Sequence, residues 1–235
     1  MNETTLSVQN IHSYYGKSHI LFGVDFSVRK GETFCLMGRN GAGKTTTFKS
    51  IVMLVPPKEG KVLFNGKEIN GLKPYHAARL GIGLVPEDRR IFGELSVKDN
   101  LLLGTSSGRQ GHWNLEQVYT YFPALHDYQE RLAGTLSGGE QQMLTIARTL
   151  MGNPEILLLD EPTEGLSPVM VKVLKDLVLK IKELGTTILL SEQNIKFCMA
   201  VADRVVIIDK GHIVYEADVT TFRLDEEVKK RYLAV

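Results

Sequence analysis

The sequence predicts an α/β fold, in which short buried strands alternate with amphipathic helices. Apolar runs bounded by glycine, proline or polar residues lie at 32–38, 155–161 and 186–191, and each has the length of a buried strand. Between the last two runs, in 168–185, apolar residues recur at helical spacing until Gly185 ends the pattern. This alternation is typical of a sheet that is covered by helices.

The other elements of the core follow in chain order. The run 32–38 leads through a glycine-rich loop into a predicted helix over 44–55, which must end before Pro56. The segment 60–69 has β character around an Asn-Gly pair and predicts a hairpin. The segment 204–217 predicts a strand, a turn at Lys210-Gly211 and a returning strand.

The middle of the chain differs, because 88–150 contains helical signals and no convincing strand. Ser96 with Asp99 can cap a helix that starts at Val97, and a short helix from Leu115 must end at Pro123. We therefore predict one domain over 1–235. Within it, 1–87 and 151–235 form the core with a small antiparallel β-subdomain, and 88–150 forms a helical subdomain.

The composition is that of an ordinary globular protein, with 43% hydrophobic and 23% charged residues among 235. The net charge of +1 creates no global field that would favour nucleic acid or an anionic membrane. Cys35 and Cys198 lack metal-ligand spacing and indicate reduced thiols of a cytosolic protein, although a disulfide stays possible. No signal peptide or membrane span is predicted, so any membrane role goes through a partner.

One motif carries phosphate chemistry. Residues 38–45, GRNGAGKT, fit the pattern G-x-x-x-x-G-K-[ST], between a predicted strand and a predicted helix. In this pattern the glycines let backbone amides face a phosphate, Lys44 reaches the β- and γ-phosphates, and Thr45 offers a hydroxyl to Mg²⁺. The predicted nucleotide-binding residues of this P-loop are Gly38, Asn40, Gly41, Ala42, Gly43, Lys44, Thr45 and Thr46.

Two acids end the apolar strand 155–161. Asp160 can hold Mg²⁺ opposite the P-loop, and Glu161 can act as the general base that polarises the attacking water. The alternative is a strand that merely ends in polar residues. The neighbouring P-loop favours the catalytic interpretation.

A second glycine pair, in TLSGGEQQ (135–142), lies where a helix is expected to begin. Ser137 and Glu140 fit a capping box, which is a purely structural explanation. Gly138 and Gly139 would each cost that helix about 0.5–1 kcal/mol relative to alanine. They make sense if a ligand must approach the backbone closely, although this loop has no lysine.

The P-loop, LSGGEQQ and ILLLDEPT, in this order, resemble the ATP-binding subunit of ABC transporters over essentially the whole chain. The resemblance implies a P-loop NTPase (RecA-like) core with a helical signature subdomain, and an ATPase that uses ATP and Mg²⁺. It also implies a head-to-tail dimer in which Ser137 and Gly139 contact the γ-phosphate held by the partner's P-loop. The lysine that this loop lacks then comes from the opposite chain.

Further roles are implied by the resemblance. Tyr15, before Gly16, fits the aromatic that stacks on adenine, whereas Tyr14 is expected in the core. GIGLVPEDRRIF (81–92) matches the Q-loop, where Glu87 is expected to orient the metal or the water. A cytoplasmic helix of the permease is expected to dock beside this loop at Ile91 and Phe92, unless both are buried in the domain.

Three positions depart from the usual family pattern. Glu87 replaces the Q-loop glutamine, Ser167 replaces the D-loop aspartate and also suits an ordinary helix cap, and Gln193 replaces the switch histidine. These departures predict pairing with a different ATPase subunit. We therefore expect catalysis by Glu161, Lys44 and Gln193, and a metal site of Thr45, Asp160 and Glu87.

The cargo is predicted from finer resemblances. VPEDRRIF and EQN resemble the ATPases of branched-chain amino acid importers, and DEPTEG resembles those of urea and short-amide importers. NGAGKTTTF and VKKRYLA resemble the lipopolysaccharide export ATPase, which normally keeps its histidine. We expect a cytoplasmic subunit, bound to the inner face of the cell membrane through a permease, that energises amino acid uptake. A soluble ABC ATPase acting on ribosomes or DNA is less favoured, because such proteins usually carry two cassettes or a long coiled coil.

Overall fold

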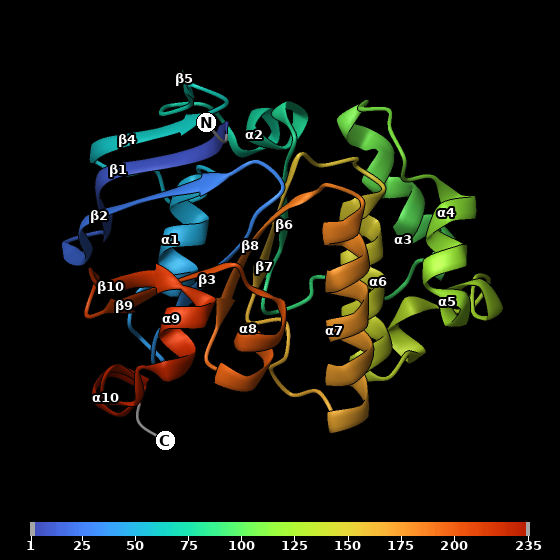
Figure 1. Ribbon diagram of the computed structural model, residues 1–235. Helices are drawn as coiled ribbons and strands as arrows, with labels where there is room; N and C mark the ends of the chain where they lie inside the picture. The colour runs from blue at the N-terminus through green and yellow to red at the C-terminus, as the bar shows by residue number, and fades with distance from the viewer. Residues whose placement is uncertain (1–2, 234–235) are drawn as a thin grey trace.

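A six-stranded sheet forms the centre of the molecule. The computed structural model describes residues 3–233, and Figure 1 shows the sheet between an antiparallel β layer and a group of helices. The strand order is β10-β9-β3-β8-β7-β6, parallel throughout except for the antiparallel pair β9 and β10. The strands are β3 (Thr33–Met37), β6 (Ile82–Val85), β7 (Ile156–Asp160), β8 (Thr187–Glu192), β9 (Arg204–Asp209) and β10 (His212–Asp218).

A second, antiparallel sheet has the order β2-β1-β4-β5. Its strands are β1 (Thr4–Tyr15), β2 (Ser18–Arg29), β4 (Glu59–Phe64) and β5 (Lys67–Glu68). The predicted hairpin is confirmed: Asn65 and Gly66 join β4 to β5, both at positive φ (48° and 75°). Sequence patterns did not predict β1, β2 or β6. Exposed polar residues interrupt the apolar pattern of the first two, and β6 has only four residues, one of which is Gly83.

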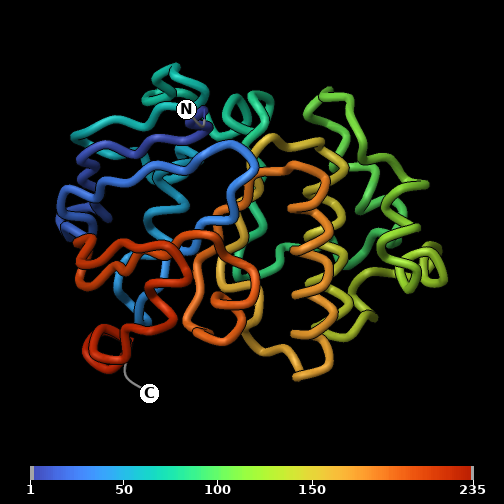
Figure 2. Tube along the Cα trace, in the orientation of Figure 1, coloured from blue at the N-terminus to red at the C-terminus, as the bar shows by residue number. Residues whose placement is uncertain are grey.

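Helices cover the central sheet and fill the middle of the chain, and Figure 2 follows their connections along the trace. They are α1 (Lys44–Ile51), α2 (Pro74–Leu80), α3 (Val97–Leu103), α4 (Leu115–Tyr121), α5 (Pro123–Asp127), α6 (Gly138–Leu150), α7 (Pro168–Glu183), α8 (Ile195–Val201), α9 (Val219–Leu224) and α10 (Glu226–Val228). Two 3₁₀ helices lie at Gly104–Ser107 and Ala133–Thr135, and a π-helix lies at Lys229–Leu233. The boundaries of the helical subdomain at 88 and 150 stay a prediction.

The two faces of the central sheet build two hydrophobic cores. Along β3, Phe34 and Leu36 join the core that contains α1 and the antiparallel sheet, whereas Cys35 and Met37 join the core that contains α6, α7 and α8. Strands that are apolar on both faces explain why the buried runs were visible in the sequence. Each fully buried leucine contributes about 1.5–3 kcal/mol relative to exposure.

The first helix is shorter than its sequence predicted. We expected a helix over 44–55, but α1 ends at Ile51. Met53 adopts a left-handed conformation with φ of 61°, and the N–H groups of Leu54 and Val55 both donate to the carbonyl of Lys49. The chain therefore leaves the helix through a left-handed turn before it reaches the prolines.

The cysteines are not free thiols, which corrects the sequence prediction. Cys35 of β3 and Cys198 of α8 form a disulfide, with 6.5 Å between their Cα atoms, and both side chains are fully buried. Their 163-residue separation hid the pairing, since only the fold brings α8 against the centre of the sheet.

Across residues 3–233, no helix combines the length and the hydropathy needed to cross a membrane.

Candidate active site

The P-loop (38–45) connects β3 to α1, and packing dictates its glycines. A Cβ atom at Gly38 would lie 2.5 Å from the carbonyl oxygen of Ile208. At Gly43, φ is 116° and a Cβ atom would lie 2.9 Å from Leu21. Only glycine fits either position. The loop therefore presents the start of α1, the positive end of a helix, to an anion.

Lys44 lies at the centre of this site. Its Nζ donates to the carbonyl oxygens of Gly38 and Arg39, at 2.7 and 3.0 Å, and forms an ion pair with Glu161 Oε1 at 3.0 Å. The side chains of Lys44 and Glu161 are only 2% and 9% exposed, so each charge depends on the other for compensation. A pocket of about 250 Å³ surrounds the pair and is lined by Ile20, Gly41, Gly43, Lys44, Thr45, Thr46 and Glu161.

Asp160 ends β7 and faces the P-loop. Its Oδ1 accepts hydrogen bonds from Ser191 Oγ at 2.6 Å and from Thr45 Oγ1 at 3.3 Å. Burial raises the pKa of Asp160, and the charges of Glu161 and Glu87 raise it further, while the bonds from Ser191 and Thr45 oppose the rise. The buried carboxylate is therefore one that a bound cation would stabilise.

The donor set suits Mg²⁺. Within residues 3–233, no three His, Cys, Asp or Glu side chains form a ready-made metal cluster. Mg²⁺ is usually held by one or two carboxylates together with substrate phosphates rather than by a cage of protein ligands. Thr45 and Asp160, in contact beside the phosphate loop, could supply that part of the coordination.

Glu161 has an unusual backbone that directs its side chain. Its φ of 46° lies in the left-handed region, which costs a non-glycine residue on the order of 1–3 kcal/mol. Its N–H donates to both the Oγ and the carbonyl oxygen of Ser191, at 3.0 and 3.1 Å. Ser191 was not predicted as a site residue. The available signal was a polar side chain near the end of β8, the strand that pairs with β7.

Gln193 joins the switch loop (190–194) to the catalytic groups. Its Nε2 donates to Asn40 Oδ1 and to Glu161 Oε2, both at 2.6 Å. One amide group thus links the P-loop to the acid at the end of β7. The structure brings the three predicted catalytic side chains, Lys44, Glu161 and Gln193, into direct contact.

Further acids surround this centre. Glu87 is exposed but close enough to raise the pKa values of Asp160 and Glu164. For Glu164, burial is the main cause, followed by the charge of Glu161 and then that of Glu87. Glu192, which sequence reasoning missed, is buried. Its carboxylate accepts from the N–H groups of Thr163, Gln193 and Asn194 at 3.1 Å each, so it joins the loop after Glu161 to the switch loop.

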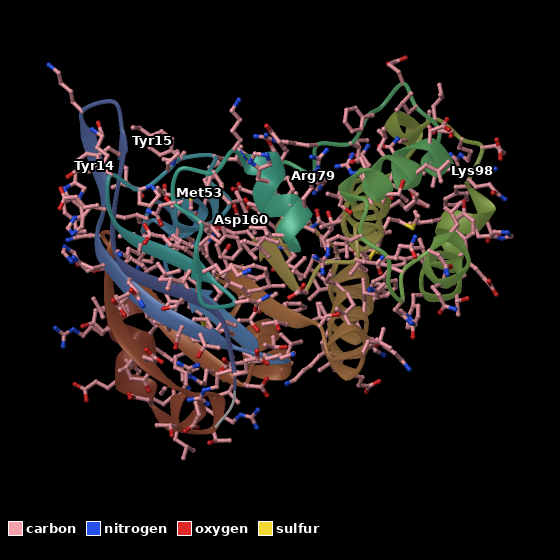
Figure 3. The ribbon with its side chains drawn as sticks, turned by 90° about the horizontal axis from the view of Figure 1, so that it is seen from above. Tyr14, Tyr15, Met53, Arg79, Lys98 and Asp160 are labelled. Carbon is pink, nitrogen blue, oxygen red and sulfur yellow. A yellow bond between two sulfur atoms is a disulfide. The ribbon has the colours of Figure 1, made fainter. Side chains whose placement is uncertain are left out.

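Two predicted groups lie outside this pocket. The capping box is present: Glu140 N–H donates to Ser137 Oγ at 3.4 Å, and Ser137 N–H donates to Glu140 Oε2 at 2.7 Å. Neither Ser137 nor Gly139 lines the P-loop pocket. Tyr15 is 46% exposed and, in the view of Figure 3, lies at the β1–β2 side of Asp160.

Tyr14 is not in the core, which corrects the sequence prediction. The side chain is half-buried and stacks on His19, with 4.1 Å between ring centroids. Lys58 Nζ lies 4.4 Å from the centroid of the same ring. Side chains alternate between the two faces of β1. Tyr14 lies on the face that carries the surface rings, not on the face that packs into the core.

The glycine loop between β3 and α1, the buried lysine and the acids at the end of β7 define a P-loop nucleotide-binding protein. The family model described as ABC transporter matches residues 21–164. The chain belongs to the ABC transporter ATP-binding family. It is the ATPase subunit of such a transporter, and ATP hydrolysis is its activity.

Relatives and solved structures agree over nearly the full length. The chain is 36% identical to the high-affinity branched-chain amino acid transport ATP-binding protein BraG of Pseudomonas aeruginosa, covering 97% of this chain and 99% of that one. It is 35% identical to the lipopolysaccharide export system ATP-binding protein LptB of Escherichia coli strain K12, covering 97% of each.

Among solved structures, a nucleotide-free ATP-binding cassette of an ABC transporter is 26% identical, with a TM-score of 0.85 over 99% of both chains. A dimeric bacterial ABC transporter cassette is 25% identical, with a TM-score of 0.80 over 91% of this chain and 98% of that one. The α/β fold with two sheets and a helical group is thus that of ABC cassettes.

Replacing Glu161 with Gln tests the base. The amide keeps the size of the side chain and the neighbouring Asp160, but it cannot accept the proton of the attacking water. We expect ATP turnover to fall by roughly 10²–10⁴-fold, with ATP binding retained and an ATP-bound dimer accumulating. Steady-state phosphate release and equilibrium ATP binding measure the two effects.

The matched control is Glu183→Gln, the same change at the exposed end of α7, which should hydrolyse ATP as the unmodified chain does. Near-normal hydrolysis by Glu161→Gln would exclude Glu161 as the base.

Proposed function

We propose that this chain energises the uptake of branched-chain or other small amino acids through a membrane permease. The relatives alone leave the cargo open, because an amino acid transport protein and a lipopolysaccharide export protein match almost equally well. Gln193 is the observation that favours import. The lipopolysaccharide export ATPase normally has histidine at this position, whereas EQN resembles branched-chain amino acid importers. Urea or short-amide import is the nearest alternative.

The site residues then take the following roles. Thr45 and Asp160 would hold Mg²⁺, and Glu87 would orient the ion or the water. ATP supplies the phosphoryl group, and Mg²⁺ would supply a counter-charge to its phosphates. Lys44 exchanges its carbonyl partners, Gly38 and Arg39, for the β- and γ-phosphates. Glu161, held by Lys44 and Gln193, accepts the proton of the attacking water.

The other half of each ATP site lies on a second chain. Ser137 and Gly139 begin α6 but do not line the P-loop pocket of their own chain. We propose that they contact the γ-phosphate on a partner ATPase, as in a head-to-tail dimer. The similarity to a dimeric bacterial cassette supports this arrangement. Tyr15, exposed at the end of β1, would stack on the adenine.

The partner ATPase is proposed to be a different subunit. Gln193 already uses its amide for Asn40 and Glu161, and a neutral donor binds an anion about 1 kcal/mol more weakly than a charged histidine does. Ser167 caps α7 through the N–H of Met170 at 3.4 Å, so it supplies no acid to the dimer seam. A partner with the ordinary glutamine and histidine would complete the pair.

The pairing proposal predicts weak activity of the isolated chain. It should bind ATP, stay largely monomeric and hydrolyse slowly. Adding the cognate ATPase and permease should raise turnover by at least about tenfold, since donors to the transferring phosphoryl group are added. ATPase rate against protein concentration, with light scattering, measures both. A steep rise with concentration to several turnovers per second in a homodimer would instead establish a competent homodimer.

A groove suits the permease. It has a volume of about 560 Å³ and lies where α2, β6 and α6 meet the segment after α3. Phe92, 51% exposed, lines it together with Tyr75 and Leu103. Ile91 packs against the larger hydrophobic core instead. We propose that a cytoplasmic permease helix binds this groove and holds the chain at the inner face of the membrane.

Replacing Phe92 with Asp should therefore abolish assembly with the permease, because a charge enters the apolar contact. Basal ATPase activity should stay within about twofold, as for most surface substitutions. Co-purification with the permease in detergent measures assembly. The control Leu224→Asp places the same charge on a leucine that is 83% exposed at the end of α9, and it should assemble normally. Assembly of the Phe92 variant would refute docking at this residue.

The cargo is tested in cells. Deleting the gene for this chain should abolish accumulation of radiolabelled leucine, isoleucine or valine at low external concentration, and the intact gene should restore it. The Glu161→Gln gene is the control for a chain that assembles without hydrolysing. Normal amino acid uptake, combined with lost urea or short-amide uptake, would favour the alternative importer. Normal uptake with an outer-membrane lipopolysaccharide defect would favour export.

A further inference from the structure

Arg89 places a guanidinium group on the signature loop (Ser137–Glu140). A Cβ atom built on Gly138 would lie 2.8 Å from Arg89 Nη1 and 3.5 Å from its Cζ. The same guanidinium approaches the loop before α7, since a Cβ atom on Gly165 would lie 3.5 Å from Nη2. Arg89 thus reaches from the Q-loop, across the glycine that begins α6, to the segment that follows the catalytic acids.

The backbone of Arg89 is fixed for this reach. Its φ is 59°, in the left-handed region. Its carbonyl oxygen accepts from Thr145 Oγ1 at 2.9 Å and from Arg148 Nη2 at 3.4 Å, and both donors belong to α6. The middle of α6 therefore holds the backbone of Arg89, while the side chain of Arg89 extends to the start of α6.

The guanidinium group of Arg89 has no counter-charge within residues 3–233. Arg89 is half-buried, and its guanidinium makes no hydrogen bond and no ion pair with the residues that the structure describes. Its neighbour Arg90 pairs with Asp88, and Arg148 donates to backbone carbonyls. Arg131 lies near Glu140 and helps to lower the pKa of that carboxyl, after the hydrogen bonding with Ser137. A guanidinium carries five donors and no acceptor, so Arg89 can bind an anion from outside the chain.

The acids on either side do not supply that anion. Glu87 and Glu161 lie close to Glu164, whose pKa their charges help to raise, and neither Glu87 nor Glu164 is in ion-pair contact with Arg89. The capping box uses the amides of Ser137 and Glu140. The amides of Gly138 and Gly139, in the first turn of α6, have no intrahelical partner. A cation and two free donors therefore meet at one surface.

We propose that Arg89 supplies the positive charge of the signature half-site, by donating to the γ-phosphate of the ATP held by the partner's P-loop. This inference rests on the proposed dimer. It adds a second cation to a γ-phosphate that already faces the P-loop lysine of the partner, and this cation comes from the Q-loop next to the signature loop. Arginine is suited to phosphate, through its paired N–H groups.

The test uses the full chain with Glu161→Gln, mixed with the cognate ATPase subunit so that the ATP-bound dimer accumulates. Into it are placed Arg89→Lys, Arg89→Met and, as the matched control, Arg90→Ala. Sedimentation with ATP measures the dimer dissociation constant, and fluorescent ATP at low protein concentration measures nucleotide affinity of the monomer. Arg89→Met, which keeps apolar packing on Gly138, should weaken pairing by about tenfold or more, equal to about 1.4 kcal/mol. Arg89→Lys should lose less, and Arg90→Ala nothing.

Monomer affinity for ATP should stay within about twofold in every variant, because the phosphate belongs to the other chain. Equal pairing by Arg89→Met and its parent would overturn the inference, and so would a variant whose monomer loses ATP affinity, since Arg89 would then act in its own site. An equal loss in Arg89→Lys and Arg89→Met would also overturn it, by showing that shape rather than charge matters. If the parent forms no ATP-dependent dimer with that subunit, the proposed dimer itself fails, and this inference fails with it.

Discussion

The buried pair of Lys44 and Glu161 is the interaction on which the site depends. Each charge is withdrawn from water and finds its main compensation in the other, 3.0 Å away. Removing one partner of such a pair typically costs about 3–5 kcal/mol, because the other charge is left buried and unpaired. The pair also holds the P-loop against the loop after β7, since Lys44 begins α1 and Glu161 follows β7. Gln193 adds the loop after β8 to the same contact. The carboxyl ends of three parallel strands are thereby joined at one point, as is usual for ligand sites of open α/β sheets.

Four acidic side chains gather around the P-loop, and their mutual repulsion favours the binding of a cation. Burial raises the pKa of Asp160 and of Glu164, and the charges of Glu161 and Glu87 add to both shifts. Lys44 is the one cation in ion-pair contact with these four acids among residues 3–233. Such a cluster is unfavourable in the absence of a ligand. A bound divalent cation would neutralise this repulsion. Binding of metal and nucleotide would therefore stabilise the folded chain more than it would if the acids were absent. The left-handed backbone conformation of Glu161 also destabilises the free chain, and it too lies at the site.

The site was predictable from the sequence where chemistry is local, and hidden where it depends on long-range contacts. The P-loop, the two acids that end the run 155–161 and the capping box each lie within a few residues, so spacing alone predicted them. Ser191 was missed, because its importance comes from the pairing of β8 with β7. Glu192 was missed for the same reason. The disulfide was misjudged, because Cys35 and Cys198 meet only through the packing of α8 on β3. β1 and β2 were not predicted, since their exposed faces break the apolar runs.

The disulfide between β3 and α8 has a mechanical consequence. β3 leads directly into the P-loop, and α8 begins directly after the switch loop. A covalent bond therefore closes a ring that contains the strand below the phosphate loop and the helix behind Gln193. Sliding of α8 along the sheet would strain this bond, so the disulfide couples the P-loop to the switch loop. The strand β6 lies at an edge of the same sheet, away from this bond. There the left-handed residues Arg89 and Arg90 connect β6 to the helices of the middle segment.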